Sequence, residues 1–291
     1  MYIVMDNINN NNNDNNNNNN NYKKIVLSGG GVKGICHVGA LYALDELNIL
    51  DKIDTFAGTS IGSLVILLYV IGYSPGQIYN FIVSFDFSKM KNISIFNIQF
   101  FGFDNCSKME YVIIRLIQQK GFDPYITLKE LYEITKKKII FTTVCVNTKE
   151  LCYLSHDTYP ELPILISVRM SMSIPFIFTP IKYKNYLYID GGCFNNYPIN
   201  LFIDSNDVLG ILLVDNKDIV ENIDNFETYI LNVLWCIFNG KNHVISQLYN
   251  NNTIKIVIDS ISTIDYSISA DKKDELFLKG YNSVLNKLNV K

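Results

Sequence analysis

The sequence predicts an α/β fold with a central, mainly parallel sheet flanked by helices. Three observations lead to this prediction. From Lys24 onward, short runs rich in β-branched residues alternate with longer segments of helical periodicity. The first two of these runs are each followed by a glycine-containing turn and then by an apolar helix pattern. The chain has 291 residues, of which 48% are hydrophobic, so it can fill a sizeable core.

The expected elements follow this alternation in chain order. Strands are predicted at residues 25–27, 55–57, 138–146, 151–154, 208–214 and 253–258. Helices are predicted at 32–47, at 60–72, from Pro75, from Ser107, from Thr127, at about 224–250 and at 270–289. Three of these helices have start signals: a capping hydroxyl before proline at Ser74-Pro75, and capping boxes at Ser107 to Glu110 and Thr127 to Glu130.

A polar tract precedes this pattern. Residues 9–21 are asparagine throughout except for Asp14. Such a tract cannot bury apolar surface, so we expect residues 1–22 to form a disordered N-terminal segment. We expect residues 23–291 to form one domain, because no internal repeat or linker divides them.

Composition excludes several classes of protein. The net charge of −3 argues against a nucleic-acid binder. The six cysteines show no CxxC pairing and there are only three histidines, so no metal site is expected. The N-terminus lacks the features of a secretory signal, and no apolar run approaches the roughly 20 residues that span a bilayer. We therefore expect a cytoplasmic protein without a transmembrane segment.

The first glycine-rich stretch is LSGGGVKG at residues 27–34, between the first strand and the first helix. Its glycines satisfy G-x-G-x-x-G, the pattern of dinucleotide-binding loops. Such a fold also needs an acid at the carboxyl end of the second strand, but Asp51 and Asp54 precede that strand. A dinucleotide-dependent oxidoreductase remains an alternative, for which binding of a nicotinamide cofactor would be the deciding observation.

The second stretch is Gly58-Thr59-Ser60-Ile61-Gly62, which is G-x-S-x-G between a strand and a helix. This context predicts a nucleophile elbow, a tight turn that presents Ser60 at the helix N-terminus. There the backbone N–H groups and the helix dipole favour a developing anion. A serine hydroxyl still needs a base to take its proton.

No histidine fits the role of that base well. His37 lies on the first helix, His156 in a probable turn, and His243 within the helix expected at 224–250. A stronger candidate is Asp190 in Asp190-Gly191-Gly192, which ends an apolar run where ligands gather in parallel sheets. Taken alone, this motif more often forms an Asx-type turn in which the carboxylate only bonds its own backbone.

LSGGGVKG, GTSIG and DGG occur in this order, with a proline-containing block at residues 169–180 before the last motif. Together they resemble the patatin-like phospholipase family over about residues 23–200. The resemblance implies a three-layer patatin-like fold and a serine-dependent lipid acyl hydrolase with no metal or organic cofactor. The chain departs from the family pattern at Ser28, Met170 and Met172, and in having DGG rather than DGA.

The resemblance also implies roles for individual residues. Ser60 would be the nucleophile and Asp190 the proton acceptor of a catalytic dyad. The oxyanion hole would lie in the loop of Gly29, Gly30, Gly31, Val32, Lys33 and Gly34, with Gly30, Gly31 and Val32 as the main N–H donors and Ile61 as a further one. Gly58, Thr59, Ile61 and Gly62 would form the elbow, and Gly191 and Gly192 the acid motif.

The substrate implied is a phospholipid or other glycerolipid ester, met at a membrane surface. A catalytically silent lipid-binding relative is an alternative, disfavoured because both Ser60 and Asp190 are present. Lys33 would steady the glycine loop, meet an anionic head group, or simply be a solvated charge on the surface. The phenylalanine-rich segment 85–103 would be either a mobile cover over the acyl channel or an ordinary part of the core.

Overall fold

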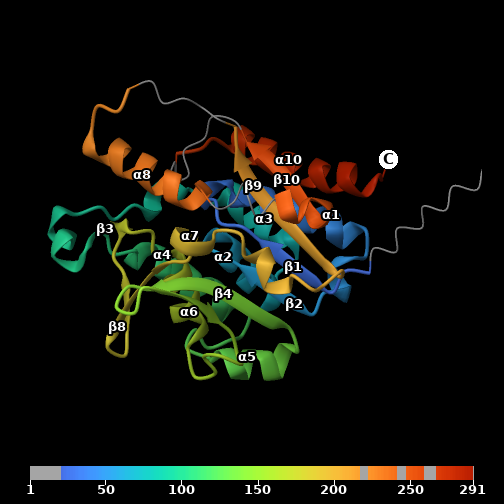
Figure 1. Cartoon of the computed structure of the whole chain (residues 1–291), viewed down its shortest axis with the longest axis horizontal. Coiled ribbons are helices and arrows are strands. Elements are labelled where there is room, and N and C mark those ends of the chain that lie inside the picture. The colour runs from blue at the N-terminus through green and yellow to red at the C-terminus, as the bar shows by residue number, and fades with distance from the viewer. Residues whose placement is uncertain (1–20, 217–221, 241–246, 259–266, 291) are drawn as a thin grey trace, which may run out of the picture.

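The structure is a computed structural model that describes residues 21–216, 222–240, 247–258 and 267–290. Its centre is an eight-stranded sheet (Figure 1). Seven strands follow the order β10-β9-β1-β2-β4-β8-β7, and the eighth, β5, also pairs with β4. The strands are β1 Lys24–Leu27, β2 Thr55–Gly58, β4 Lys138–Cys145, β5 Glu150–Leu154, β7 Ile181–Tyr183, β8 Tyr186–Asp190, β9 Val208–Asp215 and β10 Thr253–Ile258. A separate two-stranded sheet pairs β3 Gly102–Asp104 with β6 Phe176–Phe178.

Strands β10, β9, β1, β2 and β4 run parallel, whereas β5, β7 and β8 pair antiparallel with their neighbours. The prediction of a mainly parallel sheet in an α/β fold is therefore confirmed. The antiparallel strands were not predicted as such, because strand direction depends on long-range pairing that no local pattern contains.

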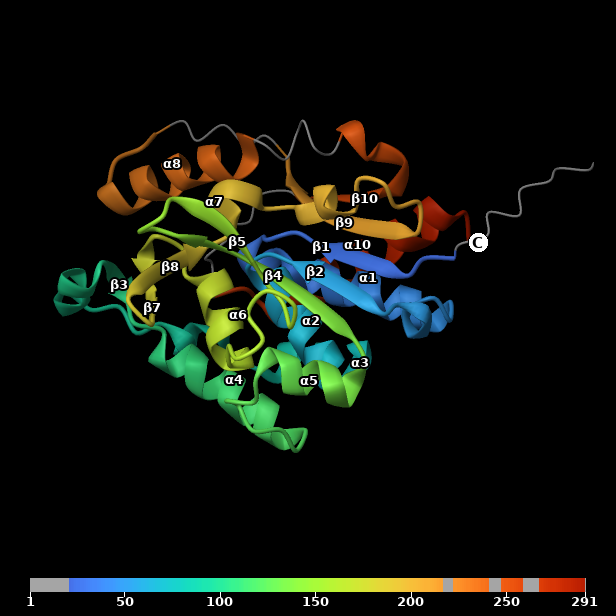
Figure 2. The ribbon, with the colours of Figure 1, turned by 60° about the horizontal axis from the view of Figure 1, so that its bottom comes forward.

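Helices cover both faces of the sheet. Figure 2 shows most of them below the sheet and α7 and α8 above it. The α-helices are α1 Ile35–Glu46, α2 Ile61–Val70, α3 Pro75–Ser84, α4 Ser107–Gln119, α5 Leu128–Thr135, α6 Ile164–Met172, α7 Gly192–Asn195, α8 Phe226–Gly240 and α10 Ala270–Leu288. Short 3₁₀ helices are η1 Gly31–Gly34, η2 Leu50–Lys52, η3 Phe87–Met90, η4 Ile95–Phe100, η5 Pro198–Phe202 and η6 Asn250–Asn252.

Two hydrophobic clusters lie on opposite faces of the sheet. Ile25 and Leu27 of β1 belong to the larger cluster, together with the buried sides of α1 and α2. Val26, between them, belongs to a smaller cluster with Tyr197 and Leu212. Successive side chains of a strand point to opposite faces, so one short apolar run supplies both cores.

Helix α10 crosses α1 at two glycines. A Cβ atom at Gly39 of α1 would collide with the carbonyl oxygen of Phe277, and one at Gly280 of α10 with that of Cys36. Both positions therefore need glycine for the helix backbones to approach. Because α1 follows the glycine loop directly, this crossing fixes the helix on which the loop rests.

Most predicted elements occur within one or two residues of their expected bounds. The N-terminal segment 1–22 falls outside the described residues except for its last two, so its disorder remains a prediction. The capping box expected at Thr127 and Glu130 is present. The one expected at Ser107 and Glu110 is wrong, because α4 is capped at Cys106, whose N–H bonds Asp104.

The order of the strands in the sheet reverses at β1, and the glycine loop and the GTSIG motif both lie near this point. From β1 the sheet grows through β2 and β4 on one side and through β9 and β10 on the other. Ligands of α/β proteins gather at such a switch point, outside the carboxyl ends of the parallel strands. The glycine loop follows β1 at this point, and the GTSIG motif follows on from β2.

Candidate active site

Ser60 lies in a strained turn between β2 and α2. Its backbone angles are φ 54° and ψ −123°, which a residue other than glycine rarely adopts. A Cβ atom at Gly62 would come within 2.7 Å of the Leu27 carbonyl oxygen, and one at Gly58 within 2.7 Å of the Ile66 side chain. Both glycines are therefore required by close approach, and the predicted elbow geometry is present.

Asp190 lies on the same edge of β4 as the elbow, because β2 and β8 both pair with the edge of β4 opposite β5. In the sheet register Gly58 of β2 is level with Phe141, and Asp190 of β8 is level with Thr143, two residues farther along β4. Because β8 runs antiparallel to β4, its last residue points back toward the elbow that extends beyond Gly58. As expected, Asp190 is the last residue of a strand, and this strand runs antiparallel to its neighbours.

The two oxygens of the Asp190 carboxyl group have different surroundings. Oδ1 accepts a hydrogen bond of 2.7 Å from the N–H of Gly192, so the Asx-type turn is present. Oδ2 is buried and makes no hydrogen bond of ordinary geometry with any described residue. The Ser60 hydroxyl is the side-chain donor near the carboxyl group, close enough to influence its pKa. Oδ1 thus holds the turn, while Oδ2 has no hydrogen-bond partner in the part of the chain that the structure describes.

Burial dominates the electrostatics of Asp190. Its side chain is 1% exposed, and desolvation raises the pKa of the carboxyl group to about 7. The nearby Ser60 hydroxyl and the Gly192 N–H act in the opposite direction and lower the pKa of Asp190, but by less. An aspartate tuned in this way can both accept and return a proton near neutral pH.

The glycine loop offers three backbone N–H groups to a ligand. Those of Gly30, Gly31 and Val32 have no acceptor among the described residues, and Gly31 and Val32 line a pocket with Ser60. The N–H of Gly29 instead bonds the Asn196 carbonyl oxygen at 3.0 Å, and that of Lys33 bonds Gly30 at 3.2 Å. The N–H groups of Gly29 and Lys33 are therefore not available to an oxyanion. The candidate donors among residues 29–34 are thus fewer than the sequence predicted.

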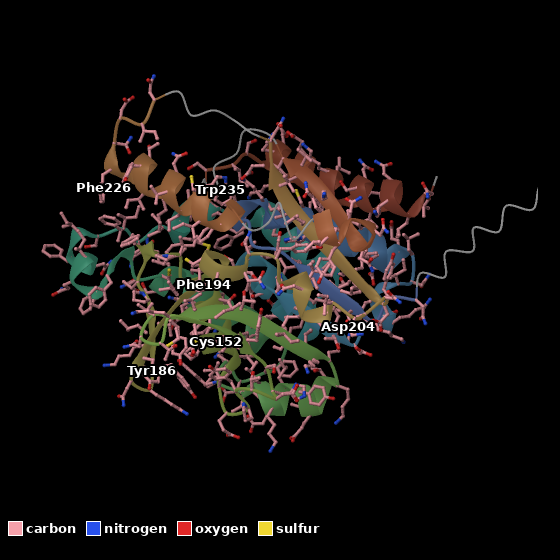
Figure 3. The ribbon with its side chains drawn as sticks, viewed as in Figure 1. Cys152, Tyr186, Phe194, Asp204, Phe226 and Trp235 are labelled. Carbon is pink, nitrogen blue, oxygen red and sulfur yellow. The ribbon has the colours of Figure 1, made fainter. Side chains whose placement is uncertain are left out.

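Lys33 points away from the pocket. Its side chain is buried, pairs with Asp215 at the end of β9, and lies 4.7 Å from the centre of the Trp235 ring of α8. Figure 3 shows Trp235 on the stretch of α8 that lies over the sheet. These contacts favour the loop-steadying interpretation of Lys33 over contact with a head group.

Several supporting residues were missed by sequence reasoning. The buried hydroxyl of Ser171 on α6 accepts a hydrogen bond of 2.9 Å from the Ser60 N–H and lies 2.9 Å from the Ser63 hydroxyl. The Thr59 hydroxyl bonds the Asn195 carbonyl oxygen at 3.0 Å, which links the elbow to α7 directly after the acid motif. Ser171 lies inside the proline-containing block, but only the fold shows what it touches.

Neither of the two histidines that the structure describes, His37 and His156, bonds Ser60. His37 is fully buried and its Nε2 lies 2.8 Å from the Ser28 carbonyl oxygen at the start of the glycine loop. Burial lowers the pKa of His37 to about 4, so the ring is neutral. His156 stacks on Tyr132 of α5, with 3.7 Å between the ring centres. His243 lies outside the described residues.

An apolar pocket opens at Ser60. It contains about 1000 Å³ of space, part of it open to solvent, and its lining is almost wholly apolar. Glycine-loop residues and Ser60 form one wall, and the others come from α1 to α4, η3 and the segment after α6, among them Ile35, Leu64, Leu68, Phe81, Phe87, Met90, Met109, Ile113, Met172 and Ile174. This lining suits an acyl chain rather than a charged dinucleotide.

The remaining expectations concern ligands and membranes. Asp54 lies just before β2 and accepts a hydrogen bond of 2.7 Å from the Thr55 hydroxyl. It is therefore at the amino end of β2, whereas a ribose-binding acid would have to lie at the carboxyl end of this strand. In the part of the chain that the structure describes, no group of three or more potential ligand side chains is arranged to hold a metal ion. None of the helices described is both long enough and apolar enough to cross a membrane.

Comparison with known proteins agrees with this geometry. The family model described as patatin-like phospholipase matches residues 25–203. An uncharacterized protein, R571 of Acanthamoeba polyphaga mimivirus, is 32% identical over 274 residues, which cover 88% of this chain and 90% of that protein. The probable lipid hydrolase 463L of Invertebrate iridescent virus 6 is 35% identical over 188 residues, which cover 60% of this chain and 61% of that protein. The solved structure of VipD from Legionella pneumophila has the same fold, with a TM-score of 0.63 at 17% identity over 92% of this chain and 67% of that one.

Proposed function

The chain belongs to the patatin-like phospholipase family, and on this premise we propose that it is a lipid acyl hydrolase that cleaves carboxylic esters of phospholipids or other glycerolipids. The observation that carries the proposal is the position of Ser60: it lines an apolar pocket beside unbonded amides, with the buried Asp190 carboxyl group behind it. Similarity to a probable lipid hydrolase supports the same substrate class.

The first half of the proposed reaction transfers the acyl group to the enzyme. The Ser60 hydroxyl attacks the ester carbonyl carbon while Oδ2 of Asp190 takes its proton. The oxyanion that forms is stabilised by the free N–H groups of Gly30, Gly31 and Val32, a kind of interaction worth about 3 kcal/mol for each donor. Asp190 then returns the proton to the departing alcohol, and an acyl-Ser60 ester remains.

The second half releases the fatty acid. Asp190, ionised again, takes a proton from a water molecule as the water oxygen attacks the acyl-Ser60 carbonyl. The same N–H groups hold the second oxyanion. When the intermediate collapses, the proton passes to Ser60 and the fatty acid leaves through the apolar pocket. The cycle consumes one ester and one water molecule and releases one alcohol and one fatty acid.

Fatty-acid release measured as a function of pH tests the proposal. Only the ionised form of Asp190 can accept the proton, and burial raises its pKa to about 7. We therefore expect kcat/KM on a phospholipid to rise with pH, with a midpoint near that pKa, and to level off above it. Mass spectrometry of the released acid would give the rates.

Two results would contradict the proposal. One is a kcat/KM value that does not change with pH near neutrality, because the base would then be a group other than Asp190. The other is the absence of ester cleavage together with binding of a nicotinamide cofactor, which would favour the dinucleotide alternative. A silent lipid-binding relative would bind the phospholipid and release no acid at any pH.

Ser171 offers a test of the elbow's support. Replacing it by alanine leaves the buried N–H of Ser60 without its acceptor, which costs about 1 to 3 kcal/mol. We expect kcat of Ser171→Ala to fall about 10-fold to 100-fold with little change in KM, since the substrate pocket is not altered.

Ser167→Ala is the matched control for this variant. Ser167 is also buried on α6, but its hydroxyl bonds only the Ile164 carbonyl oxygen in its own helix. Its kcat should stay within about twofold of the wild-type value. Equal losses in the two variants would mean that Ser171 acts through helix stability and not through the elbow.

A further inference from the structure

A charge-free segment protrudes beside the acyl pocket. Residues 92–103 contain no charged side chain. Within them lies the apolar tip, which we define as the six side chains between 49% and 79% exposed at Ile93, Ile95, Phe96, Ile98, Phe100 and Phe101. The tip includes η4 and precedes β3, at the left end of the molecule in Figure 1. So much exposed apolar surface in one place marks an interaction site.

Several polar groups of this segment bond one another. The Ser94 N–H donates to the Phe103 carbonyl oxygen at 2.8 Å, and the Asn97 side chain donates to the same oxygen at 3.0 Å. The Ser94 hydroxyl in turn accepts the N–H of Phe96 at 3.3 Å. The tip can therefore leave water without losing these hydrogen bonds, as a surface entering hydrocarbon must.

Both ends of the segment are fastened to the core. The buried Asp104 side chain accepts the N–H groups of Asn92 and Cys106, both at 2.7 Å. On the other side, Lys273 of α10 donates to the Phe85 carbonyl oxygen at 2.7 Å, and its ammonium lies 4.9 Å from the centre of the Phe87 ring. The tip's exposure is thus held in place by the fold, which argues against a loose cover.

The tip is continuous with the mouth of the pocket. Phe87 and Met90, just before it, line the pocket, as does Phe178 of β6, the strand that pairs with β3 after it. Helix α8 reaches the same end of the molecule in Figures 1 and 2 and carries further exposed apolar residues, including Phe226 at its outer end. An acyl chain drawn from a surface in contact with the tip would enter the pocket directly.

We propose that the apolar tip inserts into the surface of a lipid bilayer and holds the pocket mouth against it. The proposal rests on the proposed function, because the occupant is identified by the acyl pocket that opens beside the tip. Exposed lysines flank the tip at Lys91 and Lys108, and at Lys89, which pairs with Asp86 at 3.7 Å; this positive charge suits an anionic lipid surface. Burial of the tip's apolar area supplies the affinity.

The test compares two double variants with matched chemistry. Ile95→Ser/Ile98→Ser removes apolar area from the tip, and Ile134→Ser/Ile203→Ser removes exposed isoleucines elsewhere, where the exposed fractions are 62% and 71%. Each is made in the full chain, in both the wild-type and the Ser60→Ala background. Co-sedimentation with phosphatidylcholine–phosphatidylserine vesicles measures binding, and a short-chain soluble ester measures chemistry apart from the surface.

We expect the tip variant to bind vesicles roughly tenfold or more weakly and the control variant to bind as wild type does. Hydrolysis of the soluble ester should be unchanged in both. Vesicle binding that persists in the Ser60→Ala background separates this inference from the proposed function, since binding needs no chemistry. Equal vesicle binding by the two variants would overturn the inference. A concentration-dependent dimer that only the tip variant abolishes would also overturn it, because the tip would then contact a second copy of the chain.

Discussion

Replacing Ser60 by alanine is expected to lower the rate of ester hydrolysis about 10⁴-fold or more, because the nucleophile is lost while the pocket and the oxyanion donors remain. An active-site-directed fluorophosphonate should label the wild-type protein on Ser60 and leave the variant unlabelled. Intact-protein mass spectrometry followed by peptide mapping would measure both results. Labelling that persists in Ser60→Ala would show that another residue is the nucleophile.

The backbone at Ser60 provides an internal control. A residue other than glycine at φ 54° and ψ −123° carries strain of roughly 1 to 3 kcal/mol. Ser60→Gly should therefore be as inactive as Ser60→Ala but unfold at a higher temperature than it. Variants with equal stability would mean that the elbow is not strained, although the role of the hydroxyl would stand.

Replacing Asp190 by asparagine is expected to lower kcat about 10³-fold or more. Asparagine keeps an oxygen that can accept the Gly192 N–H, so the turn after β8 should persist. It cannot take a proton from Ser60, and the nucleophile is left without a base. Ester hydrolysis that is unaffected by Asp190→Asn would remove Asp190 from the mechanism.

The same substitution is expected to stabilise the fold at alkaline pH. The pKa of Asp190 is raised to about 7 by burial, so the unfolded chain releases this proton at a lower pH than the folded chain does. The stability of the wild-type protein therefore falls as pH rises from about 4 to about 7, and this loss is complete above that range. Asparagine does not titrate. Asp190→Asn should thus unfold at a higher temperature than wild type at about pH 8, with the gap closing toward pH 4.

Asp207→Asn is the control of opposite sign. Asp207 is not one of the residues of the candidate site. It accepts hydrogen bonds from Lys24 and Ser205, and these lower the pKa of its carboxyl group. Its contribution to stability is present above the unfolded-state pKa and is lost as pH falls through the folded-state one. Asp207→Asn should therefore be less stable than wild type at neutral pH and match it in acid. A shift of the same sign in both variants would mean that the Asp190 effect does not come from burial of its charge.

Local sequence patterns were sufficient for the parts of the fold and site that local geometry defines. Strand-turn-helix spacing identified the elbow at Ser60, because the required glycines lie two residues to either side of the serine. The capping hydroxyls at Ser74 and Thr127 marked two helix starts for the same reason. The capping box at Ser107 failed because Asp104, held in the separate β3–β6 sheet, takes over the start of α4.

Features that depend on pairing between distant segments could not be predicted in this way. The antiparallel direction of β8, the engagement of the Gly29 amide by Asn196 and the Ser171 contact all join residues far apart in the chain. The segment 85–103 shows the same limit: its composition indicated apolar material near the substrate, but not that its first part would line the pocket and its second part face outward.

The sequence alone was enough to predict the α/β class, the serine elbow, the acid motif and the family. Each of these depends on a few residue types that lie close together in the chain. Only the tertiary structure decided which oxygen of Asp190 is free, which loop amides remain unbonded and which phenylalanines are exposed. These are properties of burial and of hydrogen-bond partners, and a residue acquires them only when segments distant in sequence pack together. Short motifs therefore indicate the proposed chemistry, whereas the fold sets the pKa of Asp190 and the exposure of the apolar tip.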